Sequence, residues 1–244
     1  MLDILLGSWQ LFLVGQYPQG PLGGLAITII LSVLGLVVSF PFSILIALAR
    51  VSAMRVFRIP AIVLVYTVRG VPLIMLIFWT YFVAPIVVGR PVTGFTTMVC
   101  TLVLYESVYL SDVIRAGIQA LPTGQTQAAH ALGLGYLQTM WHIILPQALY
   151  NMIPGMVSQF VSIIKETSLA SVISVHEVTF SANQINAALL TKPLQIYLIL
   201  ALTYFALCFA LSQLARYLES RIAGKRTRLV RIVAPTDIAL SEAA

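Results

Sequence analysis

The stretch Leu25–Ala49 reads LAITIILSVLGLVVSFPFSILIALA and decides the class of this protein. It contains no charged residue, and about 20 mostly apolar residues are enough for a helix to cross the hydrocarbon core of a bilayer. Pro41 lies inside the stretch, where membrane-spanning helices tolerate a proline that soluble helices would not. The stretch therefore predicts a transmembrane helix that is bent, rather than ended, at Pro41.

The composition of the whole chain agrees with this prediction. Of its 244 residues, 59% are hydrophobic and 9% are charged, and the mean hydropathy is +0.97. Soluble domains have about 45–50% apolar and about 25% charged residues. So little charge excludes a soluble enzyme, a disordered tail and a disulfide-rich secreted scaffold. Cys100 and Cys208 both lie in apolar runs, where a free cysteine behaves as a small hydrophobic residue.

Charge-poor segments elsewhere in the chain predict the remaining spans. The further candidates are Ile59–Val88, Val92–Ile114, Leu145–Ile164 and Leu194–Leu218. We therefore expect an all-α integral membrane protein with about five transmembrane helices, located as a multi-pass protein in the cell inner (plasma) membrane. An odd number of spans places the two termini on opposite sides.

Basic residues predict the orientation, because Lys and Arg collect in cytoplasmic loops close to the span ends. With five spans, ten of them fall on one side: Arg50, Arg55, Arg58, Arg115, Arg216, Arg221, Lys225, Arg226, Arg228 and Arg231. Arg90 and Lys192 fall on the other side. The N-terminus is therefore expected outside and the C-terminus in the cytoplasm. The same distribution attributes the net charge of +6 to topology rather than to nucleic-acid binding.

The two ends of the chain differ from the spans. Residues 1–22 contain an apolar stretch, Leu2–Val14, that is too short to cross a bilayer, and Trp9 and Tyr17 are typical of an interfacial anchor. We expect a periplasmic or interfacial segment there. Residues 218–244 become polar and are expected to form a cytoplasmic tail.

The connection Gly117–Met140, GIQALPTGQTQAAHALGLGYLQTM, has no charged residue although it is too polar to span. A solvated loop normally carries charge, whereas a surface that a partner covers loses it. Thr123 is a candidate N-cap of a short helix that Gly133 ends, and Pro146 suits the first turn of the next span. A partner-binding helix, a re-entrant loop and a plain connector all remain open from composition.

The run Gly124–Gly133, GQTQAAHALG, followed after nine residues by Ile143–Pro146, IILP, resembles the EAA loop of permeases in binding-protein-dependent ABC importers. In that family the loop is a cytoplasmic coupling helix between spans 3 and 4 that inserts into the ATPase. The resemblance assigns ATPase coupling to Gln127, Ala128, Ala129, Leu132, Gly133 and Pro146. Gln127 departs from the family, which usually has Glu there.

Further motifs resemble the polar amino-acid branch of this family. They are Arg69–Leu73 (RGVPL), Tyr109 with Asp112–Ile118 (DVIRAGI), Lys165–Leu169 (KETSL) and Leu145–Ala148 (LPQA). The resemblance implies a type I importer fold, with residues 23–217 as the transmembrane domain. It also implies a second permease chain, identical or related, two ATPase subunits and an extracytoplasmic amino-acid-binding protein. The presence of Glu106 before the tyrosine motif resembles the pattern in permeases for glutamate and aspartate.

Ionisable residues in or beside the predicted spans are the candidates for contact with a substrate, because charges are costly in hydrocarbon and mark pathways or pairs. We assign a substrate pathway to Arg69, Glu106, Lys165, Glu166, Thr167 and Ser168. Gly70 and Pro72 are expected to open the second span. Structural clamps, Arg69 with Glu166 or Lys165 with Glu106, are the alternative. Asp112 and Arg115 are expected to form an interfacial ion pair.

The chain has no G-x-x-x-x-G-K-[ST] phosphate loop, so the partner ATPase, not this chain, is expected to use ATP. His130, His142 and His176 have no metal-ligand spacing, and we expect no cofactor, metal or catalytic residue. A secondary transporter or channel without an ATPase is the alternative function, although no internal repeat supports it. An intramembrane enzyme would need a nucleophile beside a base, and the one candidate pair is Ser168 near Lys165.

Overall fold

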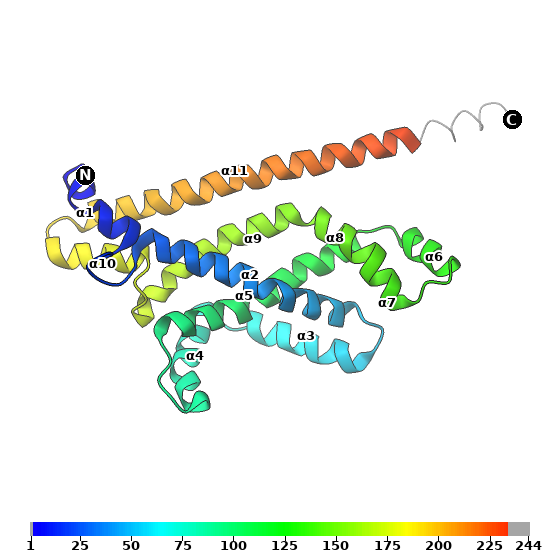
Figure 1. Cartoon of the computed structure of the whole chain (residues 1–244), viewed down its shortest axis with the longest axis horizontal. Coiled ribbons are helices and arrows are strands. Elements are labelled where there is room, and N and C mark those ends of the chain that lie inside the picture. Colours follow the sequence, from blue (N-terminus) through cyan, green and yellow to red (C-terminus); the bar gives the residue numbers. More distant parts are fainter. Residues whose placement is uncertain (1, 234–244) are drawn as a thin grey trace.

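The structure is a computed structural model that describes residues 2–233, with side chains for 7–221 (Figure 1). Every regular element in this part of the chain is a helix. The α-helices are α1 (Leu2–Val14), α2 (Gly24–Val51), α3 (Arg55–Arg69), α4 (Leu73–Val88), α5 (Gly94–Gln119), α6 (Thr123–Ala131), α7 (Tyr136–Thr139), α8 (Leu145–Asn151), α9 (Ile153–Glu166), α10 (Val178–Leu189) and α11 (Pro193–Val233). A π-helical turn covers Met140–Ile144, and a 3-10 helix covers Thr167–Ile173.

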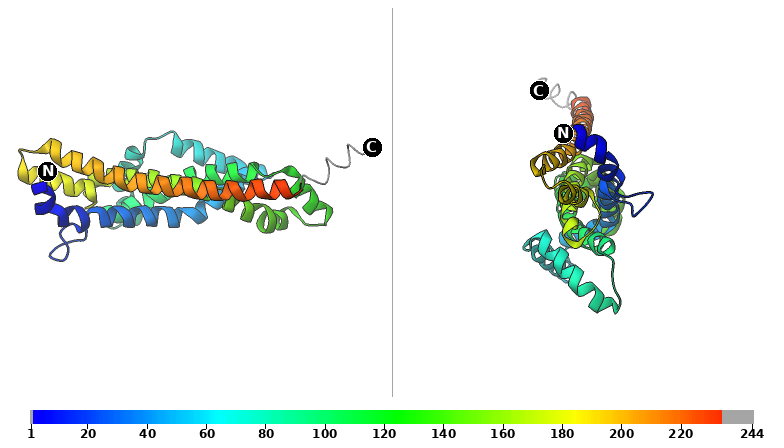
Figure 2. Two further views of the ribbon diagram at one scale, coloured as in Figure 1. Left: turned by 90° about the horizontal axis from the view of Figure 1, so that it is seen from above. Right: turned by 90° about the vertical axis from the view of Figure 1, so that its left-hand side faces the viewer.

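Four stretches of helix are long and apolar enough to cross a membrane. They are Gly24–Val51, Gly94–Gln119, Ile153–Ile173 and Pro193–Arg221. The pair α3–α4 supplies a fifth span if it is counted as one broken helix. The long helices run side by side along the long axis of the molecule in both of its side views (Figures 1 and 2). The all-α fold with about five spans is thus confirmed, and α2 continues through Pro41.

The second span is broken at the predicted place. Helix α3 ends at Arg69, α4 begins at Leu73, and their axes differ by 103°. Pro72 has no N–H to continue the helical hydrogen-bond ladder, and it disfavours helical backbone at Val71. As a result α4 leaves the bundle at a steep angle, which is clear at the bottom of Figure 1.

The fourth span begins later than predicted. Leu145 does not start it: Leu145–Asn151 forms the short helix α8, and the candidate span is Ile153–Ile173. Pro154 cannot donate a backbone hydrogen bond to Tyr150, so the helix is interrupted at Met152. The span continues past Ile164 because the 3-10 helix extends it to Ile173.

Small and hydroxylated side chains line the contact between α2 and α5, the most central pair. Ser39, Ser43, Ser107 and Ser111 are all buried, and the Ser107 hydroxyl donates to the Ser39 carbonyl oxygen at 3.3 Å. A Cβ atom on Gly35 would lie 3.5 Å from the Leu102 side chain. Small residues allow membrane helices to approach closely, where van der Waals packing replaces the hydrophobic effect.

The bundle has two distinct ends. Helices α1 and α10 lie at one end, and α6 and α7 lie at the other, which we call the α1 end and the α6 end (Figure 1). Helix α1 is 13 residues long, too short to span, and Trp9 and Tyr17 are exposed as expected for an anchor. The predicted locations of Met1 and Ala244 concern positions outside the described residues.

Candidate functional site

Helix α6 forms the core of the uncharged connection at the α6 end. It begins at Thr123 after Pro122, but the Thr123 side chain makes no capping hydrogen bond, so the predicted N-cap is wrong. Gly133 ends the helix as predicted, because its φ of +79° lies in the left-handed region that favours glycine. There is free space around its Cα, so the conformation, not crowding, requires a glycine there.

The predicted coupling residues divide into two groups. Gln127, Ala128, Leu132, Gly133 and Pro146 are exposed, and 81% of the surface of Leu132 is accessible. Ala129 is buried within the chain itself, and Leu134 donates a backbone hydrogen bond to its carbonyl oxygen at 3.1 Å. Ala129 therefore packs on the inner side of α6, against the rest of the chain, and the other residues form the outward surface.

One side-chain contact ties α6 to the segment that leads into the fourth span. The Gln125 amide donates to Oε1 of Gln147 at 3.0 Å, and Gln147 in turn donates to the Ile143 carbonyl oxygen at 2.9 Å. Pro146 lies in the first turn of the short helix α8, directly after the π-helical turn, and not in the first turn of the span as predicted. Helix α6 is thus connected to the spans through hydrogen bonds and a short helical segment, not through a free loop.

Within the bundle, Glu106 and Gln159 join α5 to α9. The Gln159 amide donates to Oε2 of Glu106 at 2.8 Å, while Oε1 of Glu106 is buried without a partner. Oε2 of Glu166, at the end of α9, is also buried and unpartnered. Two carboxylates with free lone pairs are an unusual feature in a span, because unmatched polar atoms are costly away from water.

The rest of the KETS run is arranged differently. The Lys165 side chain is exposed and has no ion-pair partner in the described part of the chain, so the predicted Lys165–Glu106 clamp is wrong. The Thr167 hydroxyl donates to the Ile164 carbonyl oxygen, and the Ser168 hydroxyl donates to that of Lys165. These two hydroxyls are thus engaged by their own helix, which is typical of Ser and Thr in membrane helices.

Arg69 pairs with Asp112, so the predicted Arg69–Glu166 clamp is also wrong. Asp112 accepts hydrogen bonds from Arg50 at 2.6 Å and from Arg69, and it forms the expected pair with Arg115 at 3.5 Å. The Arg69 guanidinium also lies 5.1 Å from the Tyr109 ring centroid. One carboxylate thus holds three arginines from α2, α3 and α5, and the first helix of the broken second span, α3, ends at this cluster.

Glu177, which the sequence reasoning missed, is the third buried carboxylate. It precedes α10 and accepts backbone hydrogen bonds from Thr179 at 2.8 Å and Phe180 at 2.9 Å. The Tyr204 hydroxyl of α11 also donates to it, at 3.1 Å. Burial raises the pKa of Glu177 to about 7, although these hydrogen bonds oppose the rise. An acid directly before an apolar helix is an N-terminal capping signal that could have identified it.

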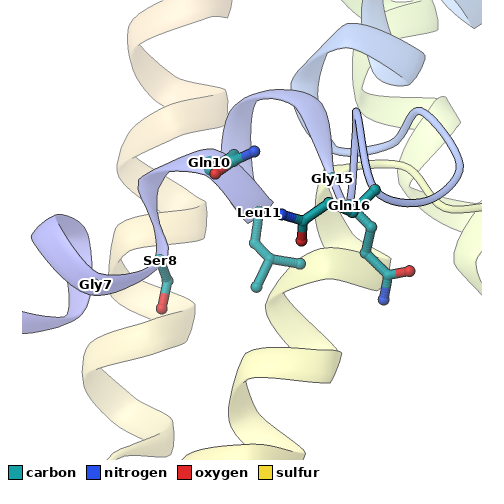
Figure 3. Close-up of a pocket in the computed structure, with 7 residues that line it drawn as sticks. Gly7, Ser8, Gln10, Leu11, Gly15 and Gln16 are labelled. Carbon is teal, nitrogen blue, oxygen red and sulfur yellow. The ribbon is translucent and has the colours of Figure 1, made fainter.

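A shallow groove of about 350 Å³ lies on α1 and the following loop, at the α1 end. Its lining is uncharged and includes Ser8, Gln10 and Gln16, which project from the chain around the groove (Figure 3). The Gln10 amide donates to the Tyr17 carbonyl oxygen at 2.7 Å and holds the loop against α1. The groove offers neutral hydrogen-bonding groups but no titratable one.

Comparison with known proteins places this arrangement in a family context. Residues 39–224 match the family described as "Binding-protein-dependent transport system inner membrane component". The chain is 36% identical over 209 residues to an inner membrane amino-acid ABC transporter permease, YhdY, from Escherichia coli. That match covers 84% of this chain but only 57% of the longer relative.

Two further similarities cover nearly the whole of the matched protein. A probable glutamine ABC transporter permease, GlnP from Bacillus subtilis, is 36% identical over 214 residues, which cover 85% of this chain and 98% of the relative. The crystal structure of an amino acid ABC transporter with histidines has a TM-score of 0.74 and 30% identity. That similarity covers 81% of this chain and 92% of the other.

Proposed function

Because this chain belongs to the family of binding-protein-dependent transport system inner membrane components and is a multi-pass inner membrane protein, we propose that it is the permease subunit of an ABC importer for polar amino acids. In this proposal the chain supplies the membrane pathway, and a separate ATPase supplies the energy. The observation that carries the proposal is α6, an exposed and uncharged helix at one end of the bundle.

The α6 surface is suited to binding a partner protein. Gln127, Ala128, Leu132 and Gly133 are outward-facing and uncharged, and the cores of protein interfaces are depleted of charge. We assign this surface to the ATPase subunit. Movement of the ATPase would pass through the Gln125–Gln147 contact and Pro146 to the spans, as a rigid-body switch between two states of the interface.

The remaining partners follow from the same proposal. A second permease chain, identical or related, completes the pathway, two ATPase subunits bind the two α6 helices, and an extracytoplasmic binding protein delivers the substrate. The α6 end then faces the cytoplasm and the α1 end faces outward. The excess of arginine near the α6 end, with Arg50, Arg55, Arg58 and Arg115, supports this orientation.

Two groups of charged residues support transport of a zwitterion. The Glu106–Gln159–Glu166 group presents carboxylate oxygens that suit an ammonium, and the Asp112 cluster has more arginines than acids, which suits a carboxylate. Arg69 is an exposed residue of the Asp112 cluster, and Lys165, next to Glu166 in the chain, is also exposed. Thr167 and Ser168 then contribute to the shape of the pathway through their helix, since their hydroxyls are engaged.

The names of the two relatives support an amino-acid substrate, one of them glutamine. We propose glutamate, aspartate or a close relative such as glutamine as the substrate. The test is uptake by the reconstituted complex with a panel of labelled amino acids, together with co-elution of an ATPase. Uptake without ATP and without a co-eluting ATPase would favour a secondary transporter or channel instead.

Two substitutions separate a pathway role from a structural one. Lys165→Met and Glu106→Gln should lower uptake while the complex still assembles, because each replaces an ionisable group in the pathway with a non-ionisable side chain of similar size. Ser220→Ala, at an exposed position further along α11, is the control. Loss of assembled complex in both variants would indicate structural residues and contradict this part of the proposal.

A further inference from the structure

Two adjoining cavities at the α6 end differ sharply in character. The first, which we call the apolar groove, has a volume of about 600 Å³ and lies between the end of α2, the start of α3 and α7. It is lined mainly by large apolar side chains, among them Leu45, Leu48, Met54, Phe57, Leu137 and Trp141. Its size falls in the range of about 300–1,000 Å³ that is typical of ligand pockets.

The second, which we call the basic cavity, has a volume of about 520 Å³ and is lined by Arg50, Arg58, Gln119, Thr123 and Thr126 among others. Arg50 is paired with Asp112. Arg58 forms no ion pair with any described residue, and its side chain is half-buried in the wall of the cavity. The cavity therefore combines an uncompensated cation with hydroxyl and amide donors, which is the donor set that a phosphate group requires.

The two cavities share part of their lining. Tyr136 and Met140 belong to both, so the apolar groove leads directly into the basic cavity. Arg55 lies three residues before Arg58 on α3 and adds an exposed cation to the same region. An apolar groove that leads into a cationic cavity matches an amphiphile with an anionic headgroup.

We propose that this composite cavity binds one anionic phospholipid, with an acyl chain in the apolar groove and the phosphate at Arg58. Basic pockets between membrane helices bind the headgroups of anionic lipids, and Trp and Tyr prefer the depth at which headgroup and acyl chain meet. A transmembrane helix of a partner protein fits this cavity less well, because it is about 10 Å wide and would need an acid opposite Arg58. The proposal requires only that the chain is embedded in a membrane.

The bound lipid would add to the contact between two parts of the chain that already share a core cluster, in which Ala47 of α2 lies with Met140 and Ile144. The groove joins the α2–α3 connection to α7 and the π-helical turn, and this segment carries α6. Occupancy should therefore stabilise the α6 end and fix the position of α6 relative to α2.

The experiment uses the full chain, purified in detergent and stripped of lipid. Phosphatidylglycerol and phosphatidylcholine with the same acyl chains are added separately, and native mass spectrometry counts the bound molecules while thermal unfolding reports stabilisation. We expect one tightly held phosphatidylglycerol and a raised midpoint, with neither for phosphatidylcholine. Inorganic phosphate should not reproduce the effect, because it leaves the apolar groove empty.

Three variants test the location. Arg58→Gln should weaken phosphatidylglycerol binding about fivefold, the effect of losing one basic contact near a membrane surface. Ala53→Trp, which fills the apolar groove, should also weaken it. Arg216→Gln, an exposed arginine on α11 outside both cavities, is the matched control and should bind normally.

Several results would overturn the proposal. Equal losses in Arg58→Gln and Arg216→Gln would mean a general electrostatic attraction rather than a site. Equal binding of phosphatidylcholine, or full stabilisation by inorganic phosphate, would remove the match between the cavity and an anionic lipid. If Ala53→Trp instead released a second permease chain or the ATPase with the lipid count unchanged, the groove would be a protein interface.

Discussion

The Nε2 atom of Gln159 lies 2.8 Å from Oε2 of Glu106, and this hydrogen bond is the principal polar link between α5 and α9 within the bundle. Glu106 is fully buried, and its second carboxylate oxygen has no partner among the described residues. The Gln159 amide is therefore the main group that offsets the cost of burying this acid. Glu106 also lies close to Glu166, so the bond helps to organise the acidic part of the proposed pathway.

Gln159→Leu should destabilise the protein, because it leaves the buried Glu106 carboxyl without its donor. We expect the free energy of unfolding to fall by about 1–3 kcal/mol, the cost of an unsatisfied buried polar group. Thermal or denaturant unfolding of the purified chain measures this change. Gln213→Leu on the exposed face of α11 makes the same change of side chain without a buried partner and should be neutral. Equal stability of the two variants would contradict the role given to Gln159.

Asp112→Asn should destabilise the α6 half of the bundle, because three arginines lose their shared counter-charge. Since the Asp112 side chain is 21% exposed, we expect a loss of about 2 kcal/mol, below the value for a fully buried pair. Adding Arg50→Gln to this variant should restore part of the stability. A double-mutant cycle checks the coupling, and additive effects would mean that the contact contributes nothing.

The arginines around Asp112 should contribute unequally. The Arg50 side chain is 10% exposed, whereas that of Arg69 is 46% exposed, and solvent screens exposed pairs. Arg50→Gln should therefore lower the unfolding midpoint more than Arg69→Gln. If Arg69 lines the pathway as proposed, Arg69→Gln should instead have the larger effect on uptake. The reverse ranking in both assays would exclude these roles.

Leu132→Glu should block ATPase binding while the permease remains folded, because Leu132 is highly exposed on the α6 surface and a charge would enter the core of the interface. Co-purification of the ATPase measures this loss. Leu194→Glu, which is 81% exposed at the opposite end of the bundle, is the matched control and should retain the ATPase. Normal transport by Leu132→Glu with its ATPase bound would contradict the assignment of α6.

The neighbouring positions should respond in two further ways. Ala129→Glu should mainly lower the free energy of unfolding of the permease and affect ATPase binding less, because Ala129 is buried within its own chain. Gly133→Ala should be mildly destabilising because of its positive φ, and Gly133→Asp should in addition impair ATPase binding. Comparing unfolding midpoints with ATPase retention separates strain from interface loss.

Glu177 contributes a pH-dependent part of the free energy of unfolding. This contribution should fall as the pH rises from about 4.5 to about 7. Burial raises the pKa of this carboxyl from 4.5 to about 7, so in this window the folded state holds a proton that the unfolded state has released. Stability then decreases with pH, by at most about 3 kcal/mol. Glu177→Gln removes this dependence, so its unfolding midpoint should vary less with pH than that of the wild type. Parallel pH profiles for the two proteins would contradict the raised pKa.

The orientation can be tested with reporter fusions at Gly89 and after the last residue. The excess of basic residues around the α6 end predicts that Gly89 is outside and the C-terminus is in the cytoplasm. The two reporters should therefore indicate opposite sides. A shared location would require that α3 and α4 do not together complete one crossing.

Much of the fold could be predicted from the sequence, because membrane spans and helix ends depend on local properties. Uninterrupted apolar runs specify α2 and α11, and a charge-poor run specifies α5, since unpaired backbone groups are not tolerated in lipid. Pro72 predicts the break between α3 and α4, because proline lacks an N–H. Gly133 predicts the end of α6, because glycine readily adopts a positive φ. The late start of the fourth span was missed because Pro146 was interpreted as its first turn, whereas Pro154 is where the span begins.

The pairing of the charged residues was decided only by the tertiary structure. The sequence identified Arg69, Glu106 and Lys165 as costly residues in a membrane, but the clamps that it offered as the alternative to a pathway, Arg69 with Glu166 and Lys165 with Glu106, do not form. The acid with which an arginine pairs depends on the rotation and tilt of neighbouring helices, and the packing of α3 against α5 brings Arg69 to Asp112 instead. The burial of Ala129 and Glu177 has the same origin. Hydrophobic patterns specify that a helix is buried on one face, whereas long-range packing determines which helix lies against that face.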